Sequence, residues 1–225
     1  KIKELREIKD AYKKNPSLIL SVGFNRRFSP HLREIKKFLG ENSKNTNIIA
    51  TMNAGAISKD HWTQNFKLEG GRIIGEACHL IDACVFLLGS LVKSVCMTSL
   101  GGNTDLGTDN VSILLKFDNG SNGVINYFSN GSRKYMKERI EIHSKSRTWV
   151  MDNYRKTQSF GVPGFKTLKT KIDKGHSKQF LELFKSLKEN KSEVIPVEQI
   201  FNVTEASLLA IQSIEENKWM SFDEN

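Results

Sequence analysis

The sequence predicts an α+β fold: a predominantly antiparallel open sheet with helices on one face, preceded by a helix and a strand of a parallel α/β unit. Three features of the sequence indicate this fold. An amphipathic helix at the start is followed at once by a near-continuous apolar run, which is typical of a strand buried on both faces. Short segments with strand patterning fill the middle of the chain, and two helical segments close it.

The elements of the first forty residues have clear boundary signals. Apolar residues recur at helical spacing through residues 2–12, and this helix is expected to end at Asn15, because the residue before a proline is pushed out of the helical region. Residues 18–24 form the expected buried strand. The next helix is expected to start after Ser29 as N-cap and to end at Gly40.

The middle of the chain is expected to form a meander of strands. The expected strands are residues 48–53, 92–100, 111–117, 123–129, 138–143 and 148–151. Asp118-Asn119-Gly120 is a strong hairpin signal. A helix over residues 74–88 is apolar almost all round, so it must be buried. The closing helices are expected at 176–188 and 198–217.

The basic surplus of the chain is local. The 225 residues include 34 Lys and Arg against 25 Asp and Glu, a net charge of +9, and residues 131–178 alone carry 13 basic and 4 acidic side chains. A nucleic-acid partner would rest on this charge alone, so none is expected. The basic segment is a better candidate for contacting a phosphate or carboxylate of a small ligand, with a solvated surface as the alternative.

Cysteine usage and hydropathy exclude further classes of protein. Cys78, Cys84 and Cys96 form no C-x-x-C pair, so neither a disulfide framework nor a metal site is expected, and a cytoplasmic location fits. No apolar run approaches the roughly 20 residues that a membrane-spanning helix needs, so no membrane partner is expected.

One helix carries three titratable groups at regular spacing. Glu76, His79 and Asp82 follow a glycine-rich turn at positions i, i+3 and i+6, which places neighbours of the series close together on the helix. Burying three such groups costs free energy unless they are paired or functional. A carboxylate three residues after a histidine can fix its tautomer, so the pattern is compatible with a general base; a structural core histidine is the alternative.

Three motifs together resemble one enzyme family. GFNRRFSP (23–30), NAG-x-IS-x-DHW (53–62) and GGRIIGEACHLIDACVFLLG (70–89) are similar to the carboxyl-terminal domain of the Gfo/Idh/MocA oxidoreductases. They resemble in particular the two-part bacterial proteins in which this domain follows an alcohol-dehydrogenase-like region. The resemblance implies an NAD(P)-dependent enzyme that acts on a secondary hydroxyl of a sugar, nucleotide-sugar or cyclitol.

The resemblance also implies roles for seven residues. His79 would exchange a proton with the substrate hydroxyl, and Asp82 would position it. The residues that would contact the substrate are Glu76, Asn25, Arg26, His61 and Trp62. The family's aspartate four residues before the histidine is Gly75 in this chain, which leaves open whether Glu76 takes its place.

The same resemblance implies two domains. Residues 1–28 would be the last helix and strand of a Rossmann domain, and residues 29–225 the substrate-binding and oligomerisation domain. The G-x-G-x-x-G turn that holds the cofactor pyrophosphate is absent from the sequence. We therefore expect NAD or NADP to be bound by the full-length protein and not tightly by these residues.

A second hypothesis makes the chain a non-catalytic, sheet-mediated binding or dimerisation module. Alternating apolar residues in Val111–Phe117 and Val124–Phe128 are expected to form an apolar open face that packs against a second copy. A homo-oligomer is expected under either hypothesis.

Overall fold

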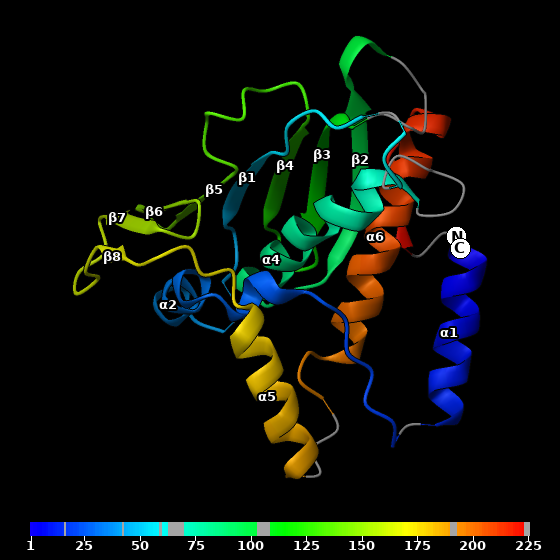
Figure 1. The fold of residues 1–225 in the computed structure, drawn as a ribbon, viewed down its shortest axis with the longest axis horizontal. Coiled ribbons are helices and arrows are strands. Elements are labelled where there is room, and N and C mark those ends of the chain that lie inside the picture. Colours follow the sequence, from blue (N-terminus) through cyan, green and yellow to red (C-terminus); the bar gives the residue numbers. More distant parts are fainter. Residues whose placement is uncertain are drawn as a thin grey trace.

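A nine-stranded sheet dominates the computed structural model, which describes residues 1–15, 17–41, 43–58, 60–62, 70–102, 109–189 and 193–222 (Figure 1). The strand order is β8-β7-β6-β5-β1-β4-β3-β2-β9. The strands are β1 (Asn47–Asn53), β2 (Val92–Ser99), β3 (Asn110–Phe117), β4 (Asn122–Phe128), β5 (Glu138–Ser144), β6 (Arg147–Asp152), β7 (Lys156–Phe160), β8 (Leu168–Lys169) and β9 (Met220–Ser221). Only the β1–β4 pairing among them is parallel. The predicted α+β class and the six predicted strands are confirmed, whereas β7, β8 and β9 were not predicted.

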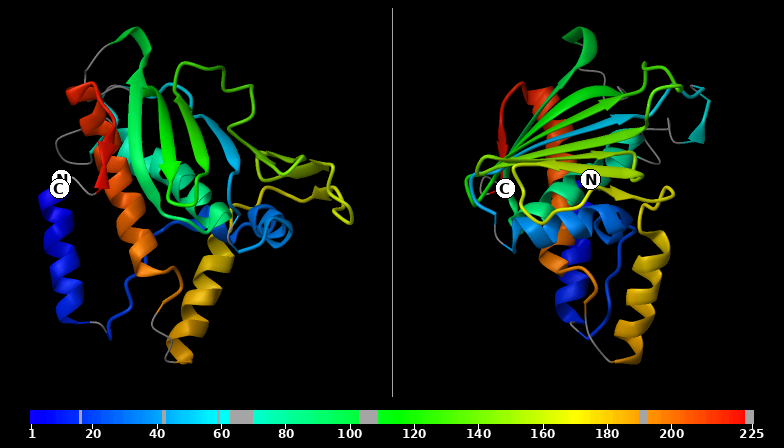
Figure 2. Two further views of the ribbon diagram at one scale, coloured as in Figure 1. Left: turned by 180° about the vertical axis from the view of Figure 1, so that it is seen from behind. Right: turned by 90° about the vertical axis from the view of Figure 1, so that its left-hand side faces the viewer.

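The helices lie on one face of this sheet (Figure 2). They are α1 (Ile2–Lys14), the 3-10 turn η1 (Asn25–Phe28), α2 (Pro30–Leu39), the π-helical turn η3 (Ile73–Ala77), α4 (Cys78–Leu88), the 3-10 turn η4 (Leu100–Gly102), α5 (His176–Lys188) and α6 (Val197–Glu216). The Ser29 side chain accepts a hydrogen bond from the Leu32 N–H, which confirms it as the N-cap of α2. No helix in the described part of the chain is long and apolar enough to cross a membrane.

The alternation of residues along the strands explains which face the helices cover. Val111, Ile113 and Leu115 of β3 are buried on the helical side, and Tyr127 of β4 is completely buried there. The other face carries a mixed set that includes Ser112. Period-2 alternation thus turns Val111, Ile113 and Leu115 toward the helices and leaves Leu114 and Phe128 exposed on the other face, where they lie among polar residues.

Residues 18–24 do not form the predicted strand. They run extended from α1 to η1 and pair with no strand among the described residues. Their links to the rest of the chain are few, such as the hydrogen bond from the Gln179 side chain to the Val22 carbonyl. An apolar run becomes a strand only when neighbouring strands pair with it, so the sequence pattern alone was insufficient here.

Helix α4 is the central element of the core. It packs against α2, α6 and η1, and its residues Leu80, Ile81, Leu87 and Leu88 are fully buried. This confirms the prediction that the helix over residues 74–88 is buried on all sides. Its first part departs from a regular α-helix, because the Cys78 N–H donates to the Ile73 carbonyl five residues earlier. Such π-turns occur frequently at functional sites.

Candidate active site

His79 lies in the first turn of α4, directly after the π-turn. The imidazole is partly buried, and its edge faces the ring of Phe24 at a centroid distance of 6.1 Å. Its Nδ1 atom is buried and has no hydrogen-bond partner in the described part of the chain. A buried polar atom without a partner is uncommon, so this nitrogen is a candidate acceptor for a ligand.

The surroundings of His79 keep its ring neutral. Burial, followed by the positive charge of Arg26, lowers the pKa of His79 to about 4, against the opposing effect of Glu138 and Glu76. At neutral pH the imidazole therefore carries no charge and can accept a proton.

The hydrogen bonds of Asp82 in the described part of the chain come from Arg27. Its fully buried carboxylate is held by Arg27, whose Nε lies 3.1 Å from both carboxylate oxygens and whose Nη2 also donates to Oδ1. The Arg27 Nη1 donates to Gln199 at 2.8 Å. Burial raises the pKa of Asp82 to about 6 even though the Arg27 charge opposes this. Asp82 is thus the anchor of η1 on α4.

Glu76 is the most heavily bonded carboxylate near His79. It accepts hydrogen bonds from Arg72 Nη2 at 3.1 Å, from Lys137 Nζ at 3.4 Å and from the Tyr127 hydroxyl. Burial opposes ionisation of Glu76, but the Tyr127 hydrogen bond and the charges of Lys137 and Arg72 outweigh it and lower its pKa. Glu76 is therefore an anion that gathers cationic side chains next to His79.

Asn25 and Arg26 lie at the opposite side of His79, and both are buried. The Asn25 amide donates to the Lys174 carbonyl at 2.8 Å and accepts from Arg26 at 3.0 Å. Arg26 pairs with Glu138 at 3.4 Å, and the Lys174 ammonium pairs with the same carboxylate. These polar groups are bonded to one another within the chain, so the cluster forms a wall beside His79.

His61 and Trp62 lie in a different setting. Their rings are 5.7 Å apart, and Trp62 is 66% exposed, which excludes a core-packing role for it in this chain. The structure brings Glu76, His79, Asn25 and Arg26 together.

Four further residues of the site were not predicted: Arg72, Tyr127, Glu138 and Lys174. Two of them carried a signal in the sequence. Glu138 stands two residues before Ile140, and Tyr127 two residues after Ile125, so both are in phase with buried positions of their strands. A charged residue in phase with a buried face indicates a buried pair.

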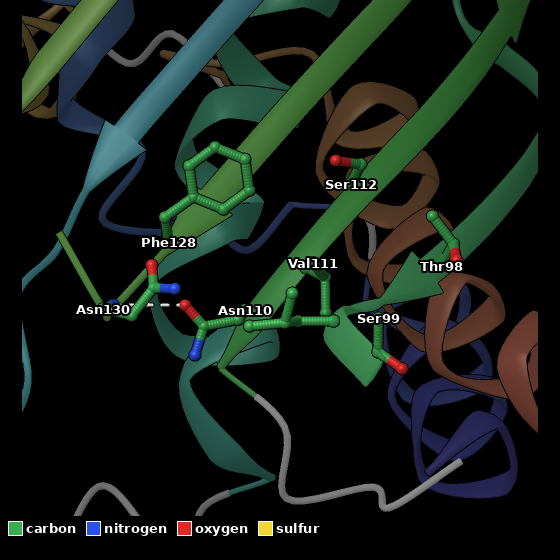
Figure 3. Close-up of a pocket in the computed structure, with 8 residues that line it drawn as sticks. Thr98, Ser99, Asn110, Val111, Ser112, Phe128 and Asn130 are labelled. Atoms are coloured by element: carbon green, nitrogen blue, oxygen red, sulfur yellow. Dashed lines mark hydrogen bonds between the residues drawn. The ribbon is translucent and has the colours of Figure 1, made fainter. Parts of the chain in front are cut away.

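A separate groove lies at the end of β2, β3 and β4 (Figure 3). Its volume is about 350 Å³, and its lining includes Ser112, Phe128 and Asn130 but none of the predicted site residues. Both polar ends of Asn110 in this groove are used within the chain, by the Asn130 and Ser129 N–H groups and by Asp109. Among the residues that the structure describes, no group of three His, Cys, Asp or Glu side chains is arranged to hold a metal ion.

Part of the chain matches a known protein family. Residues 44–149 match the GFO/IDH/MocA C-terminal domain. This matched segment is just under half of the chain, and it is the part that resembles the family's C-terminal domain. The matched segment includes β1 and all of the π-turn and α4, and therefore Glu76 and His79, whereas Asn25, Arg26 and Lys174 lie outside it.

Two curated relatives of this GFO/IDH/MocA domain protein are oxidoreductases. Inositol 2-dehydrogenase of Rhizobium meliloti is 28% identical over 143 residues, which cover 60% of this chain and 42% of that protein. An uncharacterized oxidoreductase of Bacillus subtilis, YrbE, is 31% identical over 147 residues, which cover 61% of this chain and 41% of that protein. The chain thus spans less than half the length of the curated relatives it matches.

Solved structures of GFO/IDH/MocA-like proteins share the fold. An oxidoreductase domain protein of Kribbella flavida superposes with a TM-score of 0.84 at 16% identity, over 98% of this chain and 70% of that one. Levoglucosan dehydrogenase in complex with NADH and levoglucosan superposes with a TM-score of 0.79 at 20% identity, over 96% of this chain and 70% of that one. The sheet and helix arrangement predicted from the sequence is confirmed by these likenesses.

The buried Arg27–Asp82 pair gives a prediction about stability. Asp82→Asn leaves the Arg27 guanidinium buried without a counter-charge and is expected to destabilise the chain by about 3–5 kcal/mol. The double variant Arg27→Met/Asp82→Leu removes both charges and is expected to cost much less. Urea unfolding followed by circular dichroism measures both. Glu34→Gln, in the exposed pair with Lys37, is the control and is expected to change stability by less than about 0.5 kcal/mol. A double variant as unstable as Asp82→Asn would contradict this role.

The low pKa of His79 gives a second prediction. Between pH 6.5 and about 4 the unfolded chain binds a proton on His79 that the folded chain does not, so stability falls as the pH is lowered through this range. The shift corresponds to at most about 3 kcal/mol. Histidine resonances followed by NMR should include one that titrates near pH 4 and is missing in His79→Gln, and this variant should lose that part of the pH dependence. Titration of the assigned His79 resonance near pH 6.5 would contradict the prediction.

Proposed function

We propose that this domain is the substrate half of an NAD(P)-dependent oxidoreductase that acts on a secondary hydroxyl of a sugar, nucleotide-sugar or cyclitol, with His79 as the acid/base. The observation that carries the proposal is the buried Nδ1 of His79, which has no partner in the described residues, on a ring that is neutral at pH 7. The names of the relatives, an inositol dehydrogenase and a levoglucosan dehydrogenase, support the substrate class.

The residues around His79 supply what a proton transfer needs. When a hydroxyl is oxidised, its proton must pass to a base, and the neutral imidazole can accept it. Arg26, which lowers the pKa of His79, makes the imidazolium a ready donor for return of that proton to solvent. Arg26 itself is held by Glu138 and Asn25, so its charge stays fixed during the transfer.

The nicotinamide cofactor would be held outside these residues. When bound, it exchanges a hydride with the carbon that bears the hydroxyl. The sequence contains no G-x-G-x-x-G turn, so the residues present do not fit the pyrophosphate of the cofactor.

We further infer that residues 1–28 belong to a dinucleotide-binding domain that covers part of this chain. Helix α5 supports this, because Phe180, Leu181, Phe184 and Leu187 are each at least half exposed on it. Exposed apolar side chains gathered on one helix indicate an interface. The extended apolar residues 18–24 are tied to α5 through Gln179, and the match covers 70% of the chain of each of these solved neighbours.

We also infer self-association through the open face of the sheet. Ile49, Leu114 and Phe128 are 38%, 42% and 36% exposed there, on the adjacent strands β1, β3 and β4. Large apolar side chains on neighbouring strands favour packing against a second sheet.

The acid/base role is tested in the full-length protein. His79→Asn should lower kcat for the physiological sugar or cyclitol by roughly 10²–10⁴, because a positioned general base contributes that factor. Steady-state cofactor reduction measures the rate, and circular dichroism checks the fold. His143→Asn, on the open face in β5, is the control and should keep the rate. A His79→Asn enzyme with the wild-type rate would refute the assignment.

The sheet interface is tested by sedimentation of the full-length protein. Leu114→Lys should dissociate the oligomer, because it places a charge at the centre of the contact. Phe184→Lys introduces the same charge on α5 and should leave the oligomer intact. Dissociation by Phe184→Lys but not by Leu114→Lys would assign the interface to α5 instead.

A further inference from the structure

A cluster of cationic side chains surrounds Glu76, next to His79. Arg72 donates to the Glu76 carboxylate through Nε at 3.3 Å and Nη2 at 3.1 Å. Its Nη1 reaches Asp109 at 3.2 Å and the Gly55 carbonyl at 3.1 Å. Arg72 is buried, with a side chain that is 4% exposed, so its charge is committed to these partners.

Arg133 approaches the same place from the loop between β4 and β5. Its guanidinium donates to the Ala56 carbonyl, next to the Gly55 carbonyl that Arg72 uses. A Cβ atom on Gly55 would lie 3.0 Å from the Arg133 side chain, and Gly55 has a φ of +74°. Glycine at this position therefore allows two arginines to converge on one turn.

Lys137 is a cation of this cluster that solvent reaches, as is the exposed Arg133. The Lys137 side chain is 41% exposed, and its Nζ lies 3.4 Å from Oε1 of Glu76. An ion pair this long and this exposed contributes little to stability. Glu76 keeps its hydrogen bonds to Arg72 and Tyr127 when Lys137 moves away. Lys137 can therefore exchange Glu76 for another anion at a small cost in free energy.

The charged residues of this cluster, taken together with those of the Arg26, Glu138 and Lys174 group, leave a positive surplus among the described residues. The cations are Arg26, Arg72, Arg133, Lys137 and Lys174, and the carboxylates are Glu76, Asp109 and Glu138. Two positive charges thus remain unmatched within this group. A site with an uncompensated surplus concentrates ligands of the opposite charge.

We propose that the substrate is an anionic sugar, with its carboxylate or phosphate bound by Lys137 and supported by Arg133. The proposal rests on the proposed function, because it assumes that a sugar hydroxyl is oxidised beside His79. It also gives a role to the basic segment 131–178. The assignment of His79 as the acid/base does not explain the charge of this segment.

Matched substrates test the charge preference in the full-length protein. Cofactor reduction is measured with glucose, glucuronate and glucose 6-phosphate, and with the corresponding galactose and mannose series. We expect kcat/KM for an acidic member to exceed that of its neutral counterpart at least about tenfold, since a charge-assisted hydrogen bond is worth roughly ten- to a hundredfold. The carboxylate and phosphate members show which anion is recognised.

Variants of Lys137 then test whether this side chain recognises the anion. Lys137→Met should lower the acid-to-neutral ratio of kcat/KM at least about fivefold, and Lys137→Arg should restore most of it. Lys134→Met removes the same charge from an exposed position of the same loop and should change the ratio less than about twofold. Thermal unfolding of each variant checks the fold.

The outcomes separate this inference from the function on which it rests. If neutral sugars react as well as their acids, the inference fails and the oxidoreductase function stands. If Lys134→Met lowers the ratio as much as Lys137→Met, the recognition is not by Lys137 and the inference also fails. If no sugar and no inositol reduces NAD or NADP, the proposed function fails together with the inference.

Discussion

The site depends on one buried ion pair, between Arg27 and Asp82. Arg27 belongs to η1, which follows the extended residues 18–24, and Asp82 lies in the middle of α4. The carboxylate is fully buried and the guanidinium nearly so, so neither charge has another way to be satisfied. The pair thereby fixes η1 against the helix that carries His79.

Burial acts in opposite directions on the two titratable groups of α4. It disfavours charge on both, so it lowers the pKa of His79 to about 4 and raises that of Asp82 to about 6. The two consecutive arginines of η1, Arg26 and Arg27, act on different groups of α4. The Arg27 charge opposes the effect of burial on the pKa of Asp82, whereas the Arg26 charge adds to the effect of burial on the pKa of His79. A single short turn of chain thus acts on the protonation of both groups.

The sequence alone predicted most of the helices and strands. It also pointed to several residues of the site, among them Glu76 and His79. Strands, α4 and the closing helices follow from hydrophobic periodicity, which depends on residues close in the chain. Residues 18–24 failed as a strand because pairing partners decide strand formation. The partner of Asp82 was missed because Arg27 lies 55 residues away. The spacing of His79 and Asp82 favoured a contact between them, but a buried guanidinium competes better for a carboxylate than a neutral imidazole does.

The position of α5 connects the site to the proposed nucleotide-binding domain. The helix begins after Gly175, which has a φ of +87° and where a Cβ atom would lie 2.5 Å from backbone atoms of Asn25, Phe28 and Ser29. Only glycine permits α5 to start this close to η1, and Figure 1 shows its first turn beside η1. His176, at that first turn, is among the groups that lower the pKa of His79, after burial and Arg26. A domain seated on the exposed apolar residues of α5 would therefore lie next to the imidazole, which is where a hydride acceptor must be for His79 to act as the base.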